Sequence, residues 1–311
     1  MNSKRSQCNN IDPGLLYASG ATHWSIIEAT EVDPKATELY DRWIADGCHG
    51  TMDYLERHAD LRRDPRLLLE GAQSIICFAF PYFTPNAEEP AMRIARYAPG
   101  RDYHKVVRRR LKPLADEIDR AFGAASRVCV DSAPLRERYW AARSGLGFIG
   151  RNNTLIIPGC GSYFFLGFIL TTARLTPTPV SAHPGCGTCT RCVDACPTGA
   201  LSADGRCDAS RCLSYLTIEH RGDLPPSTDL HATFYGCDRC AEACPHNHSP
   251  EPTEIADFTP RPEILRLTPR QAAEMTEEDF DRLFNGTAMR RAAIRAMKRN
   301  ANIILRNSNR N

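Results

Sequence analysis

The chain has 311 residues, of which 42% are hydrophobic, 8% aromatic and 24% charged, and this composition excludes a disordered or fibrous protein. The 39 Lys and Arg residues and the 37 Asp and Glu residues leave a net charge of +2, so a strong overall field for binding polyanions is also excluded. Cysteine is the unusual residue, because most of the 14 cysteines lie between Cys160 and Cys244.

The N-terminal residues carry two basic side chains but no apolar stretch behind them, so we expect neither a secretory nor a twin-arginine signal. The most apolar stretch, residues 154–170, is interrupted by Pro158 and two glycines and is shorter than the roughly 20 residues of a membrane helix. We therefore expect a soluble, cytoplasmic, monomeric protein whose thiols are reduced.

Residues 34–46 have Leu39, Trp43 and Ile44 at helical spacing and predict a surface helix. The elements expected after it are a strand, a helix, a strand, a helix and two strands, at residues 74–80, 105–122, 128–130, 135–144, 154–157 and 163–170. This alternation predicts an α/β or α+β domain over residues 1–175. A proline-rich stretch then marks a boundary, followed by a cysteine-rich block at 176–252 and a helical segment at 253–311.

The cysteine-rich block contains C-x2-C-x2-C-x3-C-P and then C-x2-C-x3-C-P, which is the spacing of a bacterial ferredoxin with two 4Fe-4S clusters. In such runs the last cysteine ligates the other cluster, so the predicted assignment is crossed. The first cluster takes Cys186, Cys189, Cys192 and Cys244, and the second takes Cys196, Cys237, Cys240 and one further thiol.

The fourth ligand of the second cluster must come from elsewhere, because Phe234 occupies the position three residues before Cys237. Cys207 and Cys212 are the candidates, and we favour Cys212 because it opens an apolar helical stretch. Structural zinc is the alternative for paired C-x2-C motifs. A structural zinc site needs four ligands in two short pairs, however, and does not account for the run of three cysteines or for the trailing Cys-Pro. The isolated cysteines are expected to be ordinary thiols rather than ligands: Cys8, Cys48, Cys77, Cys129 and Cys160.

Two clusters predict single-electron transfer to an acceptor held by the first 175 residues. Residues 145–150 match G-x-G-x-x-G, but they close a helix instead of following a strand, which argues against a nicotinamide site. Asp102 and His104 begin a D-x-H-x-x-G cobalamin pattern whose glycine is replaced by Val107. Any corrinoid is therefore not expected to have its cobalt ligated by His104.

Seven blocks, in order along the chain, carry a resemblance to a known family: ARYAPGRDYHK (95–105), VDSAPLRER (130–138), SGLGFIGRNNTLI (144–156), GSYFFLGFILT (161–171), CPTGAL (196–201), RCLSYLTIEHRG (211–222) and GCDRCAEACPHN (236–247). These blocks resemble the epoxyqueuosine reductases of the QueG type and, more distantly, the reductive dehalogenases. The resemblance implies an α+β protein in which an N-terminal α/β cobalamin-binding domain precedes the ferredoxin-like domain and a short C-terminal helical segment. It also implies reduction of epoxyqueuosine to queuosine at the tRNA wobble position, with base-off cobalamin fed by the two clusters and by an external flavodoxin-type or ferredoxin-type donor.

The resemblance implies that Asp131 is the proton donor, since expelling an epoxide oxygen needs a general acid. Burial against the cofactor would raise the pKa of Asp131 and keep it protonated. The alternative is an aspartate that caps a helix beginning at Leu135.

The same resemblance places further residues near the cofactor and the substrate. The expected cofactor contacts are Arg57, Asn152, Asn153, Thr154, Ser162 and Phe164, each of which could instead be a turn or strand residue. The modified base is expected to face Asp102, Tyr103 and His104, with a purely structural Tyr–His pair as the alternative.

Residues 285–311 contain seven basic residues and no acidic ones. Helical spacing puts Arg291, Arg295, Lys298 and Arg299 on one face, which predicts contact with tRNA phosphates, chiefly from the first three, a solvated basic face being the alternative. Many relatives continue into HEAT-type repeats, so we expect a weaker, more anticodon-centred grip here. A small-molecule dehalogenase-like reductase and a non-catalytic electron carrier are the competing hypotheses for the whole chain.

Overall fold

A four-stranded sheet lies at the centre of the structure, a computed structural model that describes residues 11–85 and 87–308. Its strand order is β1-β2-β7-β4 and every pair is antiparallel. The strands are β1 (His23–Glu28), β2 (Ser74–Pro81), β4 (Ser126–Cys129) and β7 (Phe164–Thr171). Antiparallel pairing decides between the two predicted classes, so this part of the chain is α+β.

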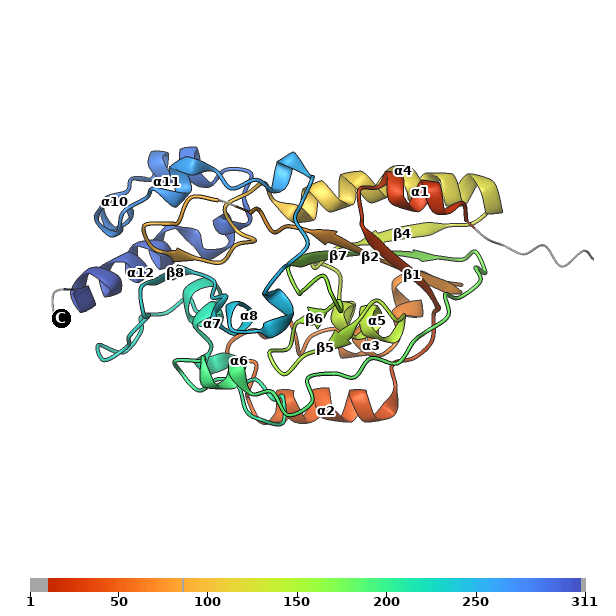
Figure 1. The fold of residues 1–311 in the computed structure, drawn as a ribbon, viewed down its shortest axis with the longest axis horizontal. Helices are drawn as coiled ribbons and strands as arrows, with labels where there is room; N and C mark the ends of the chain where they lie inside the picture. The colour runs from red at the N-terminus through yellow and green to blue at the C-terminus, as the bar shows by residue number, and fades with distance from the viewer. Residues whose placement is uncertain (1–10, 86, 309–311) are drawn as a thin grey trace, which may run out of the picture.

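Helices cover both faces of the sheet (Figure 1). On one face α4 (Tyr103–Phe122) packs Leu111 and Ile118 against Phe78 of β2. Gly167 of β7 faces this helix, and a Cβ there would come within 2.6 Å of Val107, so the helix lies unusually close to the sheet. The other face is covered by α2 (Pro34–Ala45), α3 (Ala59–Arg63) and α5 (Glu137–Arg143).

The cysteine-rich block is built from short elements and is tied to the N-terminal part by backbone pairing. Its β8 (Thr233–Tyr235) pairs in parallel with β3 (Arg93–Ile94). Its short helices are α6 (Arg191–Asp194), α7 (Leu213–Ile218) and α8 (Arg239–Glu242). A hairpin of β5 (Phe148–Ile149) and β6 (Leu155–Ile156) precedes the block.

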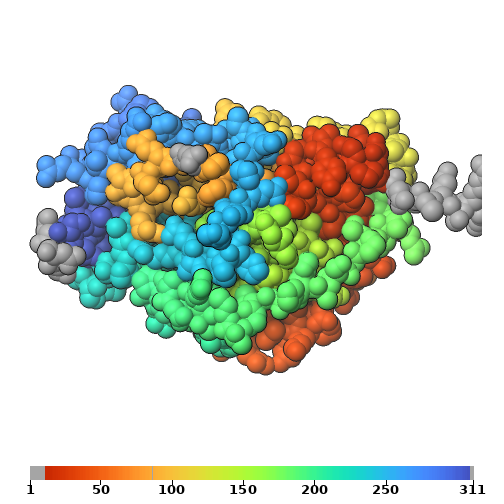
Figure 2. Space-filling model, in the orientation of Figure 1, coloured from red at the N-terminus to blue at the C-terminus, as the bar shows by residue number. Residues whose placement is uncertain are grey.

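The C-terminal helices share a core with both earlier parts of the chain. They are α9 (Pro262–Leu265), α10 (Pro269–Glu274), α11 (Glu277–Phe284) and α12 (Ala293–Ser308), with a 3-10 turn, η5 (Ala288–Ala292), before the last. Their buried side chains pack with Met92, Phe234 and Tyr235. Figure 2 shows the orange segment near residue 90 set between the blue C-terminal helices and the cyan end of the cysteine-rich block.

The structure confirms the elements expected at 34–46, 74–80, 105–122 and 163–170, with ends shifted by a few residues. Strand β1 and the helix α1 (Pro13–Ala18) were not predicted. Among the described residues, no helix is both long and apolar enough to cross a membrane.

Candidate active site

Asp131 lies at the centre of a hydrogen-bonded cluster where β4 ends. The Tyr103 hydroxyl donates to Asp131 Oδ2 at 2.8 Å, and His104 Nε2 lies 2.8 Å from the same oxygen. His104 Nδ1 is 2.7 Å from Asp102 Oδ1. Tyr103 and His104 begin α4 and Asp102 is its N-cap, so the helix terminus delivers all three groups to the end of the neighbouring strand.

Burial and hydrogen bonding act in opposite directions on the charges of this cluster. Burial alone would raise the pKa of Asp131, but hydrogen bonds from His104 and Tyr103 outweigh it and lower that pKa. Burial opposes protonation of His104 as well, yet its bonds to Asp102 and Asp131 raise the His104 pKa to about 9. At neutral pH these contacts favour a carboxylate at Asp131 beside an imidazolium at His104, and the expected protonation of Asp131 against the bound cofactor stays a prediction.

The backbone at Asp131 is strained and is held by a second carboxyl group. Asp131 has φ +48°, a left-handed conformation that costs a non-glycine residue on the order of 1 kcal/mol. Its N–H donates to Glu137 Oε1 at 2.5 Å. Burial, followed by the charge of Asp131, raises the pKa of Glu137 to about 8. The helix starts at Glu137 and not at Leu135, so the helix-capping alternative for Asp131 is wrong.

A cavity of about 470 Å³ opens next to this cluster. Arg291 lines it, pairs with Glu219 at 2.5 Å, and places its guanidinium 5.5 Å from the centre of the Tyr54 ring. The positive charge of Arg291 makes a small contribution to the lowered pKa of Asp131, so the cavity lies within electrostatic reach of the cluster. The volume falls within the range of small-ligand sites.

Arg291 therefore does not share an outward face with Arg295 and Lys298. It belongs to η5, and a positive φ of 57° at Ala293, the C-cap of η5 and first residue of α12, interrupts the helix between Arg291 and Arg295. Lys298 Nζ donates to the Met275 carbonyl, while Arg295 is 79% exposed and loosely paired with Asp223. The single basic face predicted from helical spacing is thus wrong, because the spacing assumed one uninterrupted helix.

Three of the six expected cofactor contacts, Asn152, Asn153 and Ser162, are hydrogen-bonded to the cysteine-rich block. Asn152 Nδ2 reaches the Cys240 carbonyl at 3.5 Å, Asn153 Nδ2 donates to the Gly205 carbonyl at 2.9 Å, and Ser162 exchanges two hydrogen bonds with Asn247. Thr154 donates to Asn152 at 2.8 Å. These polar side chains join the two parts of the chain across their interface.

Two further expected contacts lie away from the Asp131 cluster. Phe164 meets His23 edge to face, whereas its neighbour Phe165 stacks against Tyr103 at 4.3 Å, because successive strand residues face opposite sides. Arg57 is 70% exposed and makes only a 3.8 Å ion pair with Asp53. Sequence analysis missed Phe165, Glu137, Tyr54 and Glu219; Phe165, Glu137 and Glu219 lie within the blocks quoted above.

The structure brings together the cysteines of the first predicted cluster. The pKa of Cys192 is raised by burial and then by the neighbouring Cys186 thiolate, with Cys244 adding to the effect. Burial, Cys186 and Cys189 raise the pKa of Cys244 in the same way. The Arg151 N–H points at Cys186 Sγ from 3.4 Å, as backbone amides do around cluster sulfurs.

At the second predicted cluster, burial and the neighbouring cysteines Cys237 and Cys212 raise the pKa of Cys240. The Cys207 thiol lies beside Cys212 and lowers its pKa to about 6, and the Ser214 and Tyr215 amides add to this. Cys196 Sγ accepts from the Ala200 amide at 3.3 Å, and its assignment to this cluster stays a prediction. The described cysteines are all free thiols, and Cys8 lies outside the described residues.

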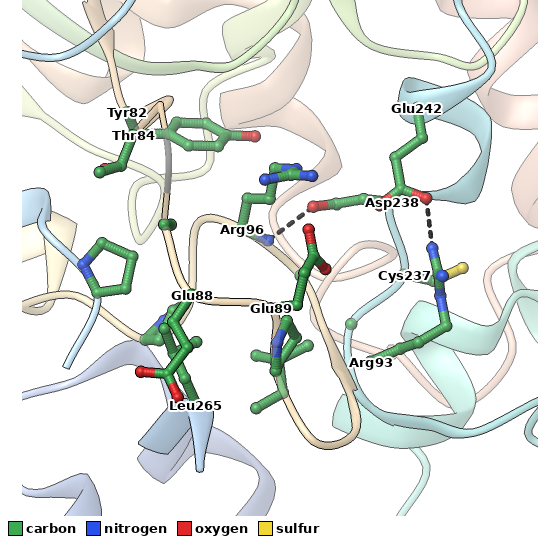
Figure 3. A pocket seen from close by; sticks show the side chains of 17 residues that line it. Tyr82, Thr84, Glu88, Glu89, Arg93, Arg96, Cys237, Asp238, Glu242 and Leu265 are labelled. Atoms are coloured by element: carbon green, nitrogen blue, oxygen red, sulfur yellow. Dashed lines mark hydrogen bonds and ion pairs between the residues drawn. The ribbon is translucent and has the colours of Figure 1, made fainter. Parts of the chain in front are cut away.

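A smaller cavity, of about 170 Å³, reaches Cys237 from the side of β3. Figure 3 shows Asp238 accepting a 2.6 Å hydrogen bond from the Arg96 N–H, and Arg93 paired with Glu242. These contacts fix the second cysteine motif to the β3 segment.

The chain matches the family epoxyqueuosine reductase QueG, DUF1730, over residues 62–132, and a 4Fe-4S double cluster binding domain over residues 185–247. It is 36% identical to the epoxyqueuosine reductase of Cellulophaga algicola over 98% of this chain and 100% of the relative. With that of Gloeobacter violaceus it shares 42% identity over 89% of each. The chain belongs to the epoxyqueuosine reductase family.

Solved structures of epoxyqueuosine reductases have the same fold. One that holds an epoxyqueuosine-modified tRNA-Tyr stem loop aligns with a TM-score of 0.84 and 29% identity, covering 94% of this chain and 80% of that one. The Bacillus subtilis enzyme, described with its catalytic aspartate loop swung out of the active site, aligns with a TM-score of 0.83 and 29% identity over the same shares. The family makes this chain an oxidoreductase of tRNA modification with an iron–sulfur domain.

Proposed function

We propose that this protein reduces epoxyqueuosine to queuosine at the wobble position of tRNA, with Asp131 as the group that delivers a proton to the substrate. The observation that carries this proposal is the Asp131 cluster, which places a protonated imidazole and a half-exposed carboxylate beside a cavity of about 470 Å³. Converting an epoxide to an alkene and water takes two electrons and two protons. A general acid at the departing oxygen and an electron path are therefore both required.

The residues near Asp131 fit a cofactor that brings its own metal ligands. His104 has both ring nitrogens bound to carboxylates, so it offers no free nitrogen to a metal ion. Cobalamin supplies cobalt within a corrin ring and, when bound, serves as the low-potential reductant of the substrate carbon. In this proposal the expected contacts from Arg57, Asn152, Asn153, Thr154, Ser162 and Phe164 remain predictions.

His104 supplies the proton in this proposal and Asp131 passes it on. The imidazolium donates to Asp131 Oδ2, to which the Tyr103 hydroxyl also donates, so a proton transferred from His104 resides on Oδ2 and passes to the substrate from that oxygen. Asp102 holds the His104 ring in place through Nδ1. Glu137 accepts the hydrogen bond of the Asp131 N–H and so holds the strained Asp131 backbone in position.

Electrons enter through the two clusters, each of which carries one at a time. The crossed cysteine assignment and an external one-electron donor of flavodoxin or ferredoxin type are part of the proposal. The test is anaerobic purification with added cobalamin, quantitation of iron and cobalt, and an assay on tRNA carrying epoxyqueuosine. About eight irons, one corrin and formation of queuosine support the proposal, whereas about eight irons without corrin binding or turnover leave an electron carrier.

We expect turnover to fall as the pH rises through about 9, because His104 then loses the proton that it passes to Asp131. The sign follows from the raised pKa, since the protonated form is complete below the ordinary pKa of 6.5 and is lost above about 9. The measurement is kcat from pH 6 to 10. His104→Gln should lower kcat and abolish this basic limb, and a variant that keeps the limb would assign it to another group.

We expect Arg295→Glu to weaken tRNA binding and to reduce the slope of log Kd against log salt by about 1, because Arg295 is exposed and its ion pair with Asp223 is loose. Arg120→Glu on α4, exposed to a similar degree, is the control. Filter binding or fluorescence anisotropy over a salt series measures both. Equal slopes for Arg295→Glu and wild type would make Arg295 part of a solvated surface.

A further inference from the structure

Three donor groups of different chemistry meet at one edge of the central sheet, apart from the cluster cysteines and Asp131. His23 begins β1, Cys160 lies in the turn between β6 and β7, and Glu251 lies in the segment that leaves the cysteine-rich block. One nitrogen, one sulfur and one oxygen from these side chains all lie within 4.8 Å of one another. Figure 2 shows the red, yellow-green and blue segments that carry them adjoining on one face.

The backbone fixes these groups in relation to one another. The Glu251 N–H donates to the Cys160 carbonyl at 2.9 Å, and Phe83 bridges to Pro252 next to it. Gly161 has φ +92°, and a Cβ there would come within 2.5 Å of Asn247 Oδ1, so the close approach of the Cys160 turn to the cysteine-rich block requires glycine. The arrangement is therefore built by the fold and does not depend on flexible surface side chains.

We propose that His23, Cys160 and Glu251 bind a zinc ion. Imidazole nitrogen, thiolate sulfur and carboxylate oxygen are the three ligand types that zinc takes in proteins, and a water molecule completes a tetrahedral site with three protein ligands. The mixed set does not suit calcium or magnesium, which prefer oxygen alone. Sequence analysis gave Cys160 no ligand role because its partners are remote in the chain.

The distances require only a small adjustment on binding. Tetrahedral zinc with bonds of about 2.0 Å to nitrogen and oxygen separates those two atoms by about 3.3 Å. His23 Nε2 and Glu251 Oε2 now lie 2.7 Å apart, so they must separate by less than about 1 Å. The His23 and Glu251 side chains are 29% and 22% exposed, so an ion reaches them from solvent without unfolding of the chain.

The competing explanation is a hydrogen-bonded His–Glu pair with a thiol alongside. Such a pair is complete with two groups, whereas here a third donor of zinc-binding type converges on it from a separate segment. A bound ion would cross-link the edge of the sheet to the chain leaving the cysteine-rich block. Zinc binding would then add to the stability of the docked arrangement, because metal affinity that exists only in the folded state is folding free energy.

The test uses the protein with both clusters loaded, so that the cluster cysteines do not compete for zinc. Anaerobic holoenzyme is equilibrated with buffered Zn²⁺, desalted, and analysed for zinc and iron. We expect one zinc per chain in wild type, with one sulfur at about 2.3 Å and the remaining ligands at about 2.0 Å in zinc X-ray absorption. Thermal unfolding is expected at a higher temperature with zinc than without it.

Cys160→Ser and His23→Gln should each lower the zinc affinity at least tenfold and remove the thermal shift while the iron content stays unchanged. The controls are Glu254→Gln and His248→Gln, exposed residues within three positions of Glu251, and both should bind zinc as wild type does. Zinc uptake equal in wild type and Cys160→Ser, or uptake matched by loss of iron, would overturn the proposal. So would the absence of retained zinc in wild type.

Discussion

Asp131→Asn is expected to lower turnover of epoxyqueuosine tRNA by about 10²- to 10⁴-fold, the range of a lost general acid. The amide keeps the shape of the side chain and can still bind the Tyr103 hydroxyl, but it cannot carry a proton from His104 to the substrate. Single-turnover assays with the reduced enzyme measure the effect directly, because they separate the reaction from the supply of electrons.

The variant should retain its iron, its corrin and its affinity for tRNA, so the loss would be confined to the rate. Asp116→Asn is the matched control, since Asp116 is an exposed carboxylate on α4 that forms an ion pair with Lys112. Activity of Asp131→Asn near that of the control would remove Asp131 from the mechanism. Loss of corrin together with activity would instead assign it to cofactor binding.

The elements that sequence analysis found are those whose signals are local. β2 is a continuous buried apolar run and α4 has a clear apolar stripe, so both are visible in a short window. β1 was missed because its sequence, HWSIIE, does not alternate cleanly and its burial comes from pairing with β2, about 50 residues away. The burial of β1 therefore depends on the fold and is not visible in the sequence of the strand itself.

The candidate site shows the same division. The cysteine spacing and the Asp131 block are contiguous motifs, and a sequence displays them in full. The protonation state of Asp131 is set by His104 on another element, which no window around Asp131 contains. The choice between Phe164 and Phe165 depends on which face of β7 packs against α4. Alternate strand residues point to opposite faces, and the sequence of β7 does not show which set faces the helix.

Cys212→Ser is expected to remove one cluster and with it nearly all turnover, whereas Cys207→Ser should keep both. The two thiols lie side by side, so the pair forms a matched comparison. Cys212 precedes α7, and the amides of Ser214 and Tyr215 help lower its pKa to about 6, which favours the thiolate that iron requires. Cys207 lacks this support, and its hydrogen bond with the Cys212 thiol, followed by burial, raises the pKa of Cys207.

Iron analysis of the anaerobically purified variants gives the outcome directly. We expect about four irons per chain in Cys212→Ser and about eight in Cys207→Ser, because each cluster holds four. Electron paramagnetic resonance of the reduced proteins should show the first cluster unchanged in both variants. If Cys207→Ser loses the iron and Cys212→Ser keeps it, the ligand is Cys207, and the cluster is bound from the turn after Gly205 instead of from the start of α7. Because the remaining ligands come from elsewhere in the block, that result would leave the cluster and the electron path in place while changing which thiol holds it.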